Sequence, residues 1–386
     1  MLDSLKRGFK PALLLSAVLL CLPTFSPFAA GTQDWVWTRE TVDSSGEAMS
    51  LAADPAGNIH LSYGGQGGLR YGYRPAGLKS HWFTMALGGG VSYTNIKADL
   101  NGNPHLCATY LSLPLRYAHY DGKRWDIQPI APEDTMSVQA QCSVAISKDG
   151  TPHVAWYRLP GGFGNNHIRY AVLKDGAWLM QTLDFDEQSG KWNWMVADQS
   201  GNPDVSYDAY VKGELKFAHW DGKDWNKQIV DHRGAHGADY SLGEGSSLAL
   251  DAKGHGHISY YSDTELRYAS QEGDTWKVET VEKIQPTGAF VDYRSTLLFD
   301  KDGVPHISYE DLGVVKHAFK IGDEWQVQVI APRGATTSRY NSMAIDVASD
   351  LIYIAYVDPL DSSLKVAVGR RAPASEAAPA PRTAKN

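Results

Sequence analysis

The chain has 386 residues, of which 43% are hydrophobic and 11% aromatic, and its formal net charge at pH 7 is −8. This composition can supply a large hydrophobic core, and all-β chains of this length often form one domain. An acidic chain without a basic stripe is a poor nucleic-acid binder, so we expect no nucleic-acid partner.

The first thirty residues resemble a secretory signal peptide. Lys6, Arg7 and Lys10 form a positive segment, Pro11–Leu22 is apolar, and Ser26–Ala30 offers a cleavage region. The apolar run is too short to span a bilayer, and no later segment is longer and more apolar. We therefore expect a secreted or periplasmic protein without a membrane span.

Residues 34–42 follow as one isolated β-strand that opens with tryptophans. After it, a unit of three alternating strands and a fourth recurs along the chain, as in Leu248–Trp276, with Gly and Asp turns between the strands. The first residue of each second strand recurs every 45 to 53 residues. This period, with four antiparallel strands per unit, predicts an all-β, seven-bladed β-propeller over residues 31–369. These anchor residues are His60, His105, His153, Asp204, His257, His306 and Tyr353.

The last unit, Met343–Gly369, has three strands and lacks a fourth. The isolated N-terminal strand is predicted to complete this blade and close the ring, because closure removes exposed sheet edges. Residues 370–386 are rich in Ala, Pro, Ser and Arg, and we expect a disordered tail there.

Two further columns recur once per unit, a basic residue in the third strand and a tryptophan that opens the fourth. Because the anchor histidines also recur once per blade, they must lie on a circle, and we predict structural hydrogen bonding rather than metal binding. The basic column is predicted to pair between strands or blades. Its members are Arg70, Arg116, Arg169, Lys216, Arg267, Lys316 and Lys365, and the tryptophans are Trp82, Trp125, Trp178, Trp225, Trp276 and Trp325.

The connections differ between the two ends of the predicted ring. Links between first and second strands and between third and fourth strands are short turns, and we call their end the short-turn face. The other connections are longer and define the long-loop face, where a binding site is expected. Cys107 and Cys142 fall in adjacent blades and can form a disulfide, but we favour two separate buried side chains.

Three turns resemble degenerate Asp-box hairpins of sialidase-type propellers: Tyr120-Asp-Gly-Lys-Arg-Trp125, Trp220-Asp-Gly-Lys-Asp-Trp225 and Lys174-Asp-Gly-Ala-Trp178. That box is a folding motif and implies architecture without activity. The Tyr73-Arg-Pro75 segment lacks the isoleucine of the sialidase Arg-Ile-Pro motif. The repeat style and export signal also resemble the exported seven-bladed propellers of ulvan-lyase-type polysaccharide lyases, which makes a lyase a better expectation than a sialidase.

Polar and aromatic residues that break the repeat gather on the long-loop face over blades 3 to 5. Aromatic faces beside Arg, His and Asn suit sugar rings. A metal site at His232 and His236 is not favoured, because the spacing is nonspecific, and no cofactor is expected. The candidate catalytic residues are His167, His232, Arg233, His236 and Tyr240, and the candidate ligand-binding residues are Tyr157, Arg158, Lys191, Trp192, Trp194, Tyr293, Arg294, Arg339 and Tyr340.

Two functions fit these patterns. The first is an exported propeller that binds a glycan or a protein through its long-loop face. The second is a lyase that cleaves an acidic, uronate-containing polysaccharide by β-elimination, which needs a base, an acid and a positive charge at the carboxylate. The residue types are present, but the sequence does not show whether they meet, so it does not decide whether the protein is an enzyme.

Overall fold

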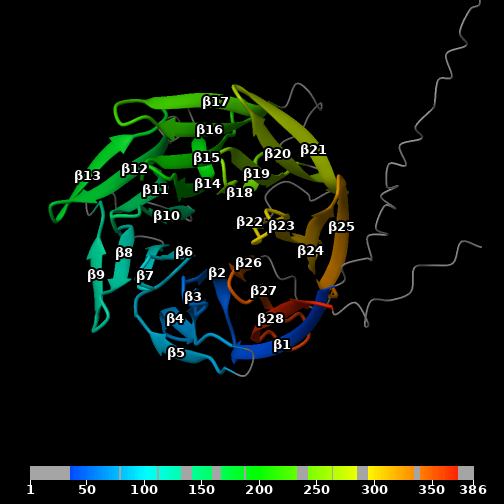
Figure 1. Cartoon of the computed structure of the whole chain (residues 1–386). Helices are drawn as coiled ribbons and strands as arrows, with labels where there is room; N and C mark the ends of the chain where they lie inside the picture. Colours follow the sequence, from blue (N-terminus) through cyan, green and yellow to red (C-terminus); the bar gives the residue numbers. More distant parts are fainter. Residues whose placement is uncertain are drawn as a thin grey trace, which may run out of the picture.

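Seven four-stranded antiparallel sheets are arranged as a ring around a central axis (Figure 1). We call the axial region between the innermost strands the channel. The computed structural model describes residues 35–77, 80–110, 113–131, 141–158, 167–186, 188–232, 242–262, 264–284, 294–333 and 340–372. Strands are the regular structure found in these ranges, and none of them contains a helix that could span a membrane. The predicted all-β, seven-bladed propeller is confirmed.

Each blade runs from an innermost to an outermost strand. Blade 1 contains β2 (Glu47–Ala53), β3 (Ile59–Gly65), β4 (Gly68–Arg74) and β5 (Phe83–Ala86); blade 2 contains β6 (Tyr93–Ala98), β7 (Pro104–Thr109), β8 (Arg116–Tyr120) and β9 (Trp125–Pro129); blade 3 contains β10 (Cys142–Ile146), β11 (Pro152–Arg158), β12 (His167–Lys174) and β13 (Ala177–Thr182); blade 4 contains β14 (Ser189–Ala197), β15 (Pro203–Ala209), β16 (Glu214–Trp220) and β17 (Trp225–His232). Blade 5 contains β18 (Glu244–Leu250), β19 (Gly256–Tyr261), β20 (Glu265–Glu272) and β21 (Thr275–Lys283); blade 6 contains β22 (Thr296–Phe299), β23 (Pro305–Asp311), β24 (Val314–Ile321) and β25 (Glu324–Ala331); blade 7 contains β26 (Asn341–Asp346), β27 (Leu351–Val357), β28 (Leu364–Arg371) and β1 (Trp35–Asp43).

The ring is closed by the N-terminal strand, as predicted. Strand β1 pairs antiparallel with β28, from Trp35 opposite Arg371 to Asp43 opposite Leu364 (Figure 1). The first and last described strands therefore lie side by side in blade 7. Strand β28 continues through Arg371, two residues beyond the predicted end of the propeller sequence.

Small polar side chains link neighbouring blades around the channel. Asn95 of blade 2 donates from Nδ2 to Oγ of Ser50 in blade 1 at 3.3 Å, and its Oδ1 accepts from the Val144 amide of blade 3 at 3.0 Å. Ser143 of blade 3 donates to Oδ1 of Asn193 in blade 4 at 2.7 Å. These buried bonds satisfy polar groups that face the channel, so they hold the innermost strands in register with one another.

The anchor histidines are structural, as predicted. His60 shares a hydrogen bond with the Tyr71 hydroxyl at 2.7 Å and a second contact with Asp54 at 3.3 Å. Burial lowers the pKa of both His105 and His153 to about 4, so these rings are neutral at neutral pH. The corresponding pairs elsewhere are His105 with Tyr117, His153 with Tyr170, His257 with Tyr268, His306 with His317, and Asp204 with His219.

The basic column mostly pairs with carboxylates of the preceding blade, which confirms the predicted pairing. In blade 5, Arg267 lies 3.1 Å from the Asp231 carboxylate of blade 4, which also accepts from the Tyr260 hydroxyl. Lys216 and Lys316 make equivalent contacts with Asp184 and Glu282. Blades 4, 5 and 6 are thus each tied to the preceding blade near the long-loop face.

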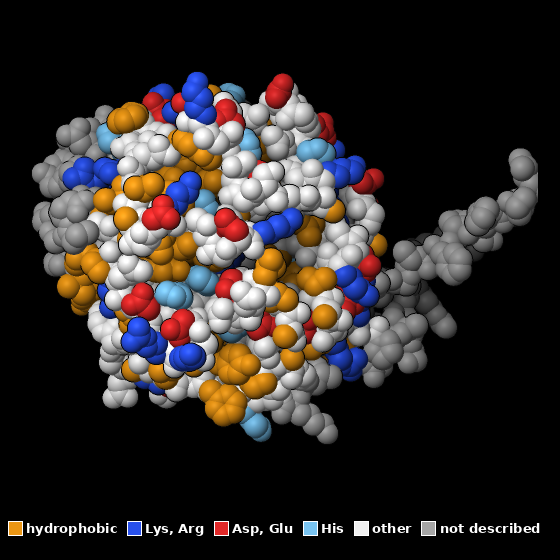
Figure 2. Space-filling model, turned by 60° about the vertical axis from the view of Figure 1, so that its left-hand side comes forward, with side chains coloured by type: hydrophobic (Ala, Val, Ile, Leu, Met, Phe, Trp, Pro, Cys, Tyr) orange, Lys and Arg blue, Asp and Glu red, His pale blue; other side chains and the backbone are white. Residues whose placement is uncertain are grey.

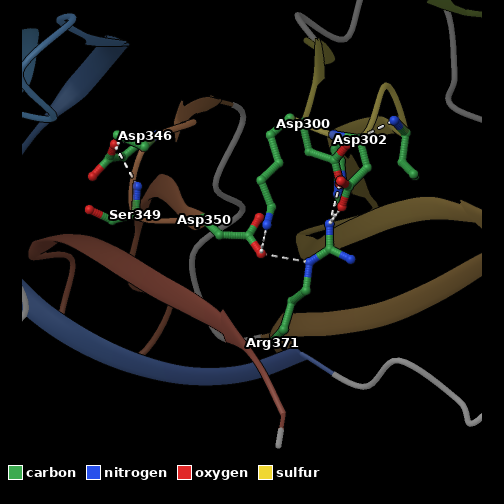
Figure 3. A network of polar contacts seen from close by, with 10 residues as sticks. Asp300, Asp302, Asp346, Ser349, Asp350 and Arg371 are labelled. Atoms are coloured by element: carbon green, nitrogen blue, oxygen red, sulfur yellow. Dashed lines mark hydrogen bonds and ion pairs between the residues drawn. The ribbon is translucent and has the colours of Figure 1, made fainter.

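A further ion-pair network joins blades 6 and 7 at the short-turn face (Figure 3). Arg371, at the end of β28, contacts Asp300 at 2.5 Å, Asp302 at 3.0 Å and Asp350 at 2.9 Å. Asp300 also contacts His306 at 3.2 Å. The terminal strand pair is therefore held to the adjacent blade by charge as well as by packing.

Cys107 of β7 and Cys142 of β10 form a disulfide, with their Cα atoms 6.3 Å apart. The preference for two separate thiols was wrong, because the blade interface brings the two side chains together. Their separation along the sequence, 35 residues, says nothing about this approach.

Replacing both cysteines by serine is expected to lower the free energy of unfolding by about 3–4 kcal/mol, since the cross-link restricts the unfolded chain over this loop. Urea unfolding of the purified protein measures the loss. Reduced wild-type protein provides the matched control and should reproduce the result. Equal stability of the reduced and oxidised forms would contradict the prediction.

Candidate functional site

Three side chains from blades 2, 6 and 7 meet at the long-loop end of the innermost strands. The guanidinium carbon of Arg294, just before β22, lies 4.6 Å from the ring centre of Tyr93 and 5.2 Å from that of Tyr340. The two tyrosine rings are 6.4 Å apart and nearly perpendicular. Because blades 2 and 6 are not neighbours, these contacts must cross the channel. We call Tyr93, Arg294 and Tyr340 the channel mouth.

Arg294 is a buried cation with unused hydrogen-bonding capacity. Its residue is only 5% exposed, and Nε and Nη2 have no hydrogen-bond partner among the described residues. Its carbonyl oxygen is fixed by Nδ2 of Asn341 at 2.7 Å, so the backbone is held in place. Burying unpaired N–H groups is costly, and a carboxylate, sulfate or phosphate group can accept from two guanidinium nitrogens at once. The arrangement therefore suits an anionic group.

A second cation lies farther along the same channel. Nζ of Lys97 on β6 is 5.0 Å from the ring centre of Trp194 on β14, and blade 3 separates these two strands. Burial lowers the pKa of the Lys97 ammonium to about 8, with no acidic neighbour opposing it in the described part of the chain. Lys97 pairs with His105 across the sheet. The residues at this register position in the other blades are uncharged: Ala52, Ala145, Val196, Ala249, Leu298 and Ala344.

Blade 4 buries the tryptophans that were expected to stack on a ligand. Trp192 is 2% exposed and Trp194 is 7% exposed, so both rings pack inside the protein. Nζ of Lys191 lies 5.0 Å from the Trp192 ring centre. The Trp192 amide donates to Asp208 at 3.0 Å, and burial raises the pKa of that carboxyl to about 6. These side chains support the channel wall in this structure.

His167, Arg158 and His232 are the described members of the candidate histidines and arginines of blades 3 and 4. His167 contacts the Asp186 carbonyl at 3.2 Å and the Phe185 ring, and it pairs with the half-buried Arg158 across the sheet. Tyr157 is buried and His232 is exposed. Within the described ranges, neither histidine has a hydrogen bond or ring contact with Arg294.

Five predicted site residues lie outside the described residues and stay predictions: Arg233, His236, Tyr240, Tyr293 and Arg339. No cluster of three or more metal-ligating side chains occurs among the described residues. Of the pair His232 and His236, His232 is described and His236 lies outside the described residues.

The structure thus brings together Arg294 and Tyr340 from the predicted set and adds two residues that the sequence reasoning missed, Tyr93 and Lys97. Lys97 had a signal in the sequence, because it places a charge where the other blades have small or apolar residues. Tyr93 had none, since its partners come from the far side of the ring.

No protein family model matches the chain, and no curated protein matches its sequence. Solved structures do resemble it in fold. A mutant of AofleA from Arthrobotrys oligospora is 14% identical, with a TM-score of 0.53, and the match covers 78% of this chain and 91% of that one. The Aleuria aurantia lectin, a six-bladed β-propeller that recognises fucose, is 14% identical with a TM-score of 0.52, covering 75% and 97%. The polysaccharide lyase Uly1 is 10% identical with a TM-score of 0.54, covering 90% and 94%.

At these identities the similarity shows the fold alone. The chain is a seven-bladed β-propeller whose structural neighbours include a lectin and a polysaccharide lyase.

Proposed function

We propose that this protein is exported and binds an acidic glycan through its long-loop face. The observation that carries the proposal is Arg294, a buried guanidinium with unpaired nitrogens beside two tyrosine rings. A carboxylate or sulfate of the glycan accepts from Arg294, and an attached sugar ring packs against the tyrosines. The signal-like N-terminus and the disulfide support export, since disulfides persist in oxidising compartments.

The test compares an acidic polysaccharide with its own neutral form. Wild-type protein is expected to bind alginate and to bind carboxyl-reduced alginate much more weakly in isothermal titration calorimetry. Arg294→Met should weaken alginate binding by about 1.5–3 kcal/mol, the usual contribution of a hydrogen bond to a charged group. Lys277→Met removes an exposed cation from the outermost strand of blade 5 and should have no effect.

If Arg294→Met binds alginate as tightly as the wild type does, the channel mouth is not the site. If the wild-type protein binds sulfated polysaccharides but not carboxylated ones, the site remains the channel mouth and the group that it recognises is a sulfate.

Lys97 gives this binding a pH dependence. An amine with a pKa of about 8 is protonated at pH 7 and mostly neutral at pH 9, whereas an ordinary lysine keeps its charge. Affinity for alginate should therefore fall between pH 7 and pH 9 at constant ionic strength. Lys97→Met should bind more weakly at pH 7 and show a flat profile. An unchanged profile in this variant would remove Lys97 from the site.

A lyase remains the second candidate, because Arg294 also suits the neutralisation of a uronate carboxylate during β-elimination. The same titrations can be followed by the absorbance of the unsaturated sugar product. Product formation that is lost in Arg294→Met would support the enzyme. Binding without product would support a carbohydrate-binding protein.

A further inference from the structure

A large hollow lies at the short-turn face of the ring, between blades 1 and 2. It has a volume of about 1080 Å³, and its walls are the short turns around Asp54, Leu100 and Lys123 together with the outermost strands β5 and β9. Figure 2 brings forward the side of the molecule that carries β9 and β13 in Figure 1, and it shows hydrophobic side chains gathered around hollowed areas. We call this hollow the blade 1–2 groove.

One column of the repeat changes at this interface. Each tryptophan that opens a fourth strand is followed three residues later by Glu or Gln in six blades. Four of these side chains accept from the tryptophan Nε1 of the next blade, at 2.9 to 3.2 Å. The six residues are Glu40, Gln128, Gln181, Gln228, Glu279 and Gln328.

Blade 1 has Met85 at this position, directly opposite Tyr71 in the sheet. Met85 is 46% exposed, and Trp125 of blade 2 packs on Tyr71 with ring centres 4.8 Å apart. Unlike the four bonded tryptophans, Trp125 has no hydrogen bond from its Nε1 to any described residue. Trp178 and Trp225 also lack this bond among the described residues, although blades 2 and 3 carry Gln128 and Gln181 at the column position. What is particular to this interface is the apolar Met85 where the other blades have Glu or Gln.

The groove wall also carries exposed apolar side chains and a basic rim, beside the polar Asn58, Asn101 and Asn103. Phe83 is 61% exposed and Leu100 is 65% exposed, and Ile127 adds a third apolar side chain. Lys123 and Arg124 are exposed at the turn before Trp125, where Arg124 lies 4.0 Å from Asp121. Among the described residues that line the groove, Asp54 is the one carboxylate, and it is buried and bonded to Asn58 and His60.

We propose that the blade 1–2 groove binds a long-chain carboxylate, that is, a fatty acid. The chain lies on Met85, Phe83, Leu100 and Ile127, and the carboxylate accepts from Lys123, Arg124 and the Trp125 Nε1–H. The groove has the size of a small-molecule site, which is too small for a folded partner. This site is independent of the channel mouth, because it opens on the opposite face and selects an apolar chain.

Dodecanoate, kept below its micellar concentration, is the probe, and calorimetry measures its binding to the full chain. Met85→Gln restores the side chain found in the other blades and should weaken binding about tenfold or more, the equivalent of losing one buried apolar side chain. Its thermal midpoint should be unchanged or higher, which shows that the variant folds. Met180→Gln makes the same change on the outermost strand of blade 3 and should leave binding unchanged.

The head group is tested with dodecyltrimethylammonium, which has the same chain and the opposite charge. Wild-type protein should prefer dodecanoate, and Lys123→Glu/Arg124→Glu should reverse this preference. The proposal is overturned if dodecanoate does not bind, if Met85→Gln binds it as tightly as Met180→Gln does, or if the wild type prefers the cation.

Discussion

Deleting residues 31–43 is expected to produce a protein that aggregates or unfolds at least about 10 °C below the intact chain. Strand β1 contributes eight paired residues to blade 7 and the buried Trp35. Losing a buried tryptophan alone costs about 3–5 kcal/mol, and each kcal/mol lowers the midpoint of a large domain by about 2–4 °C. The deletion also exposes the edge of β28, which is then free to pair with other chains. Thermal unfolding and size-exclusion chromatography measure both effects.

A synthetic peptide of residues 35–43 supplies the control, because it can add to the open edge as the missing strand. It should raise the unfolding temperature of the shortened chain, and a scrambled peptide should not. An equally stable, monomeric protein after the deletion would show that β1 does not close the ring.

Asp300→Ala is expected to lower the free energy of unfolding by about 3–5 kcal/mol, the usual cost of removing one partner of a buried ion pair. The Asp300 side chain is 1% exposed and contacts both Arg371 and His306. Without it, the Arg371 guanidinium loses its buried partner in the network between blades 6 and 7 (Figure 3). Asp302→Ala is the matched control, because that carboxylate is 54% exposed and its ion pair should contribute less than about 1 kcal/mol.

The same residue predicts how stability depends on pH. Burial acts to raise the pKa of the Asp300 carboxyl. Hydrogen bonds from His306 and from the Val304 and Asp302 amides have the opposite and larger effect, so the pKa lies below its ordinary value. The stabilisation is therefore present above the ordinary aspartate pKa of about 4 and is lost as the pH falls through the lower folded value. Urea unfolding at pH 7 should separate Asp300→Ala from the wild type, and the difference should shrink below pH 4. A constant difference would assign the effect to packing.

The repeat was readable from sequence because each blade is a local unit. Alternating strands, Gly and Asp turns and a regular period depend on neighbours within one hairpin, and Leu248–Trp276 already contains such a unit. Ring closure also followed, since the strand at one end matched the strand missing at the other. The structural role of His60 and its equivalents could be inferred because residues at one position of the repeat lie on a circle around the ring. Such residues cannot meet in one site.

The candidate sites depended on contacts between blades, which the repeat does not specify. Arg294, Tyr93 and Tyr340 meet only because the ring brings the innermost strands of blades 2, 6 and 7 around one channel. Packing between adjacent blades joined Cys107 to Cys142. Trp192 is buried, although the aromatic and basic residues around it in the sequence suggested a ligand surface. The sequence by itself determined the structure of one blade, the number of blades and the closure of the ring, because these follow from local periodicity. Only the tertiary structure decided which side chains face one another across the channel or along a groove, because those distances depend on packing between segments far apart in the chain.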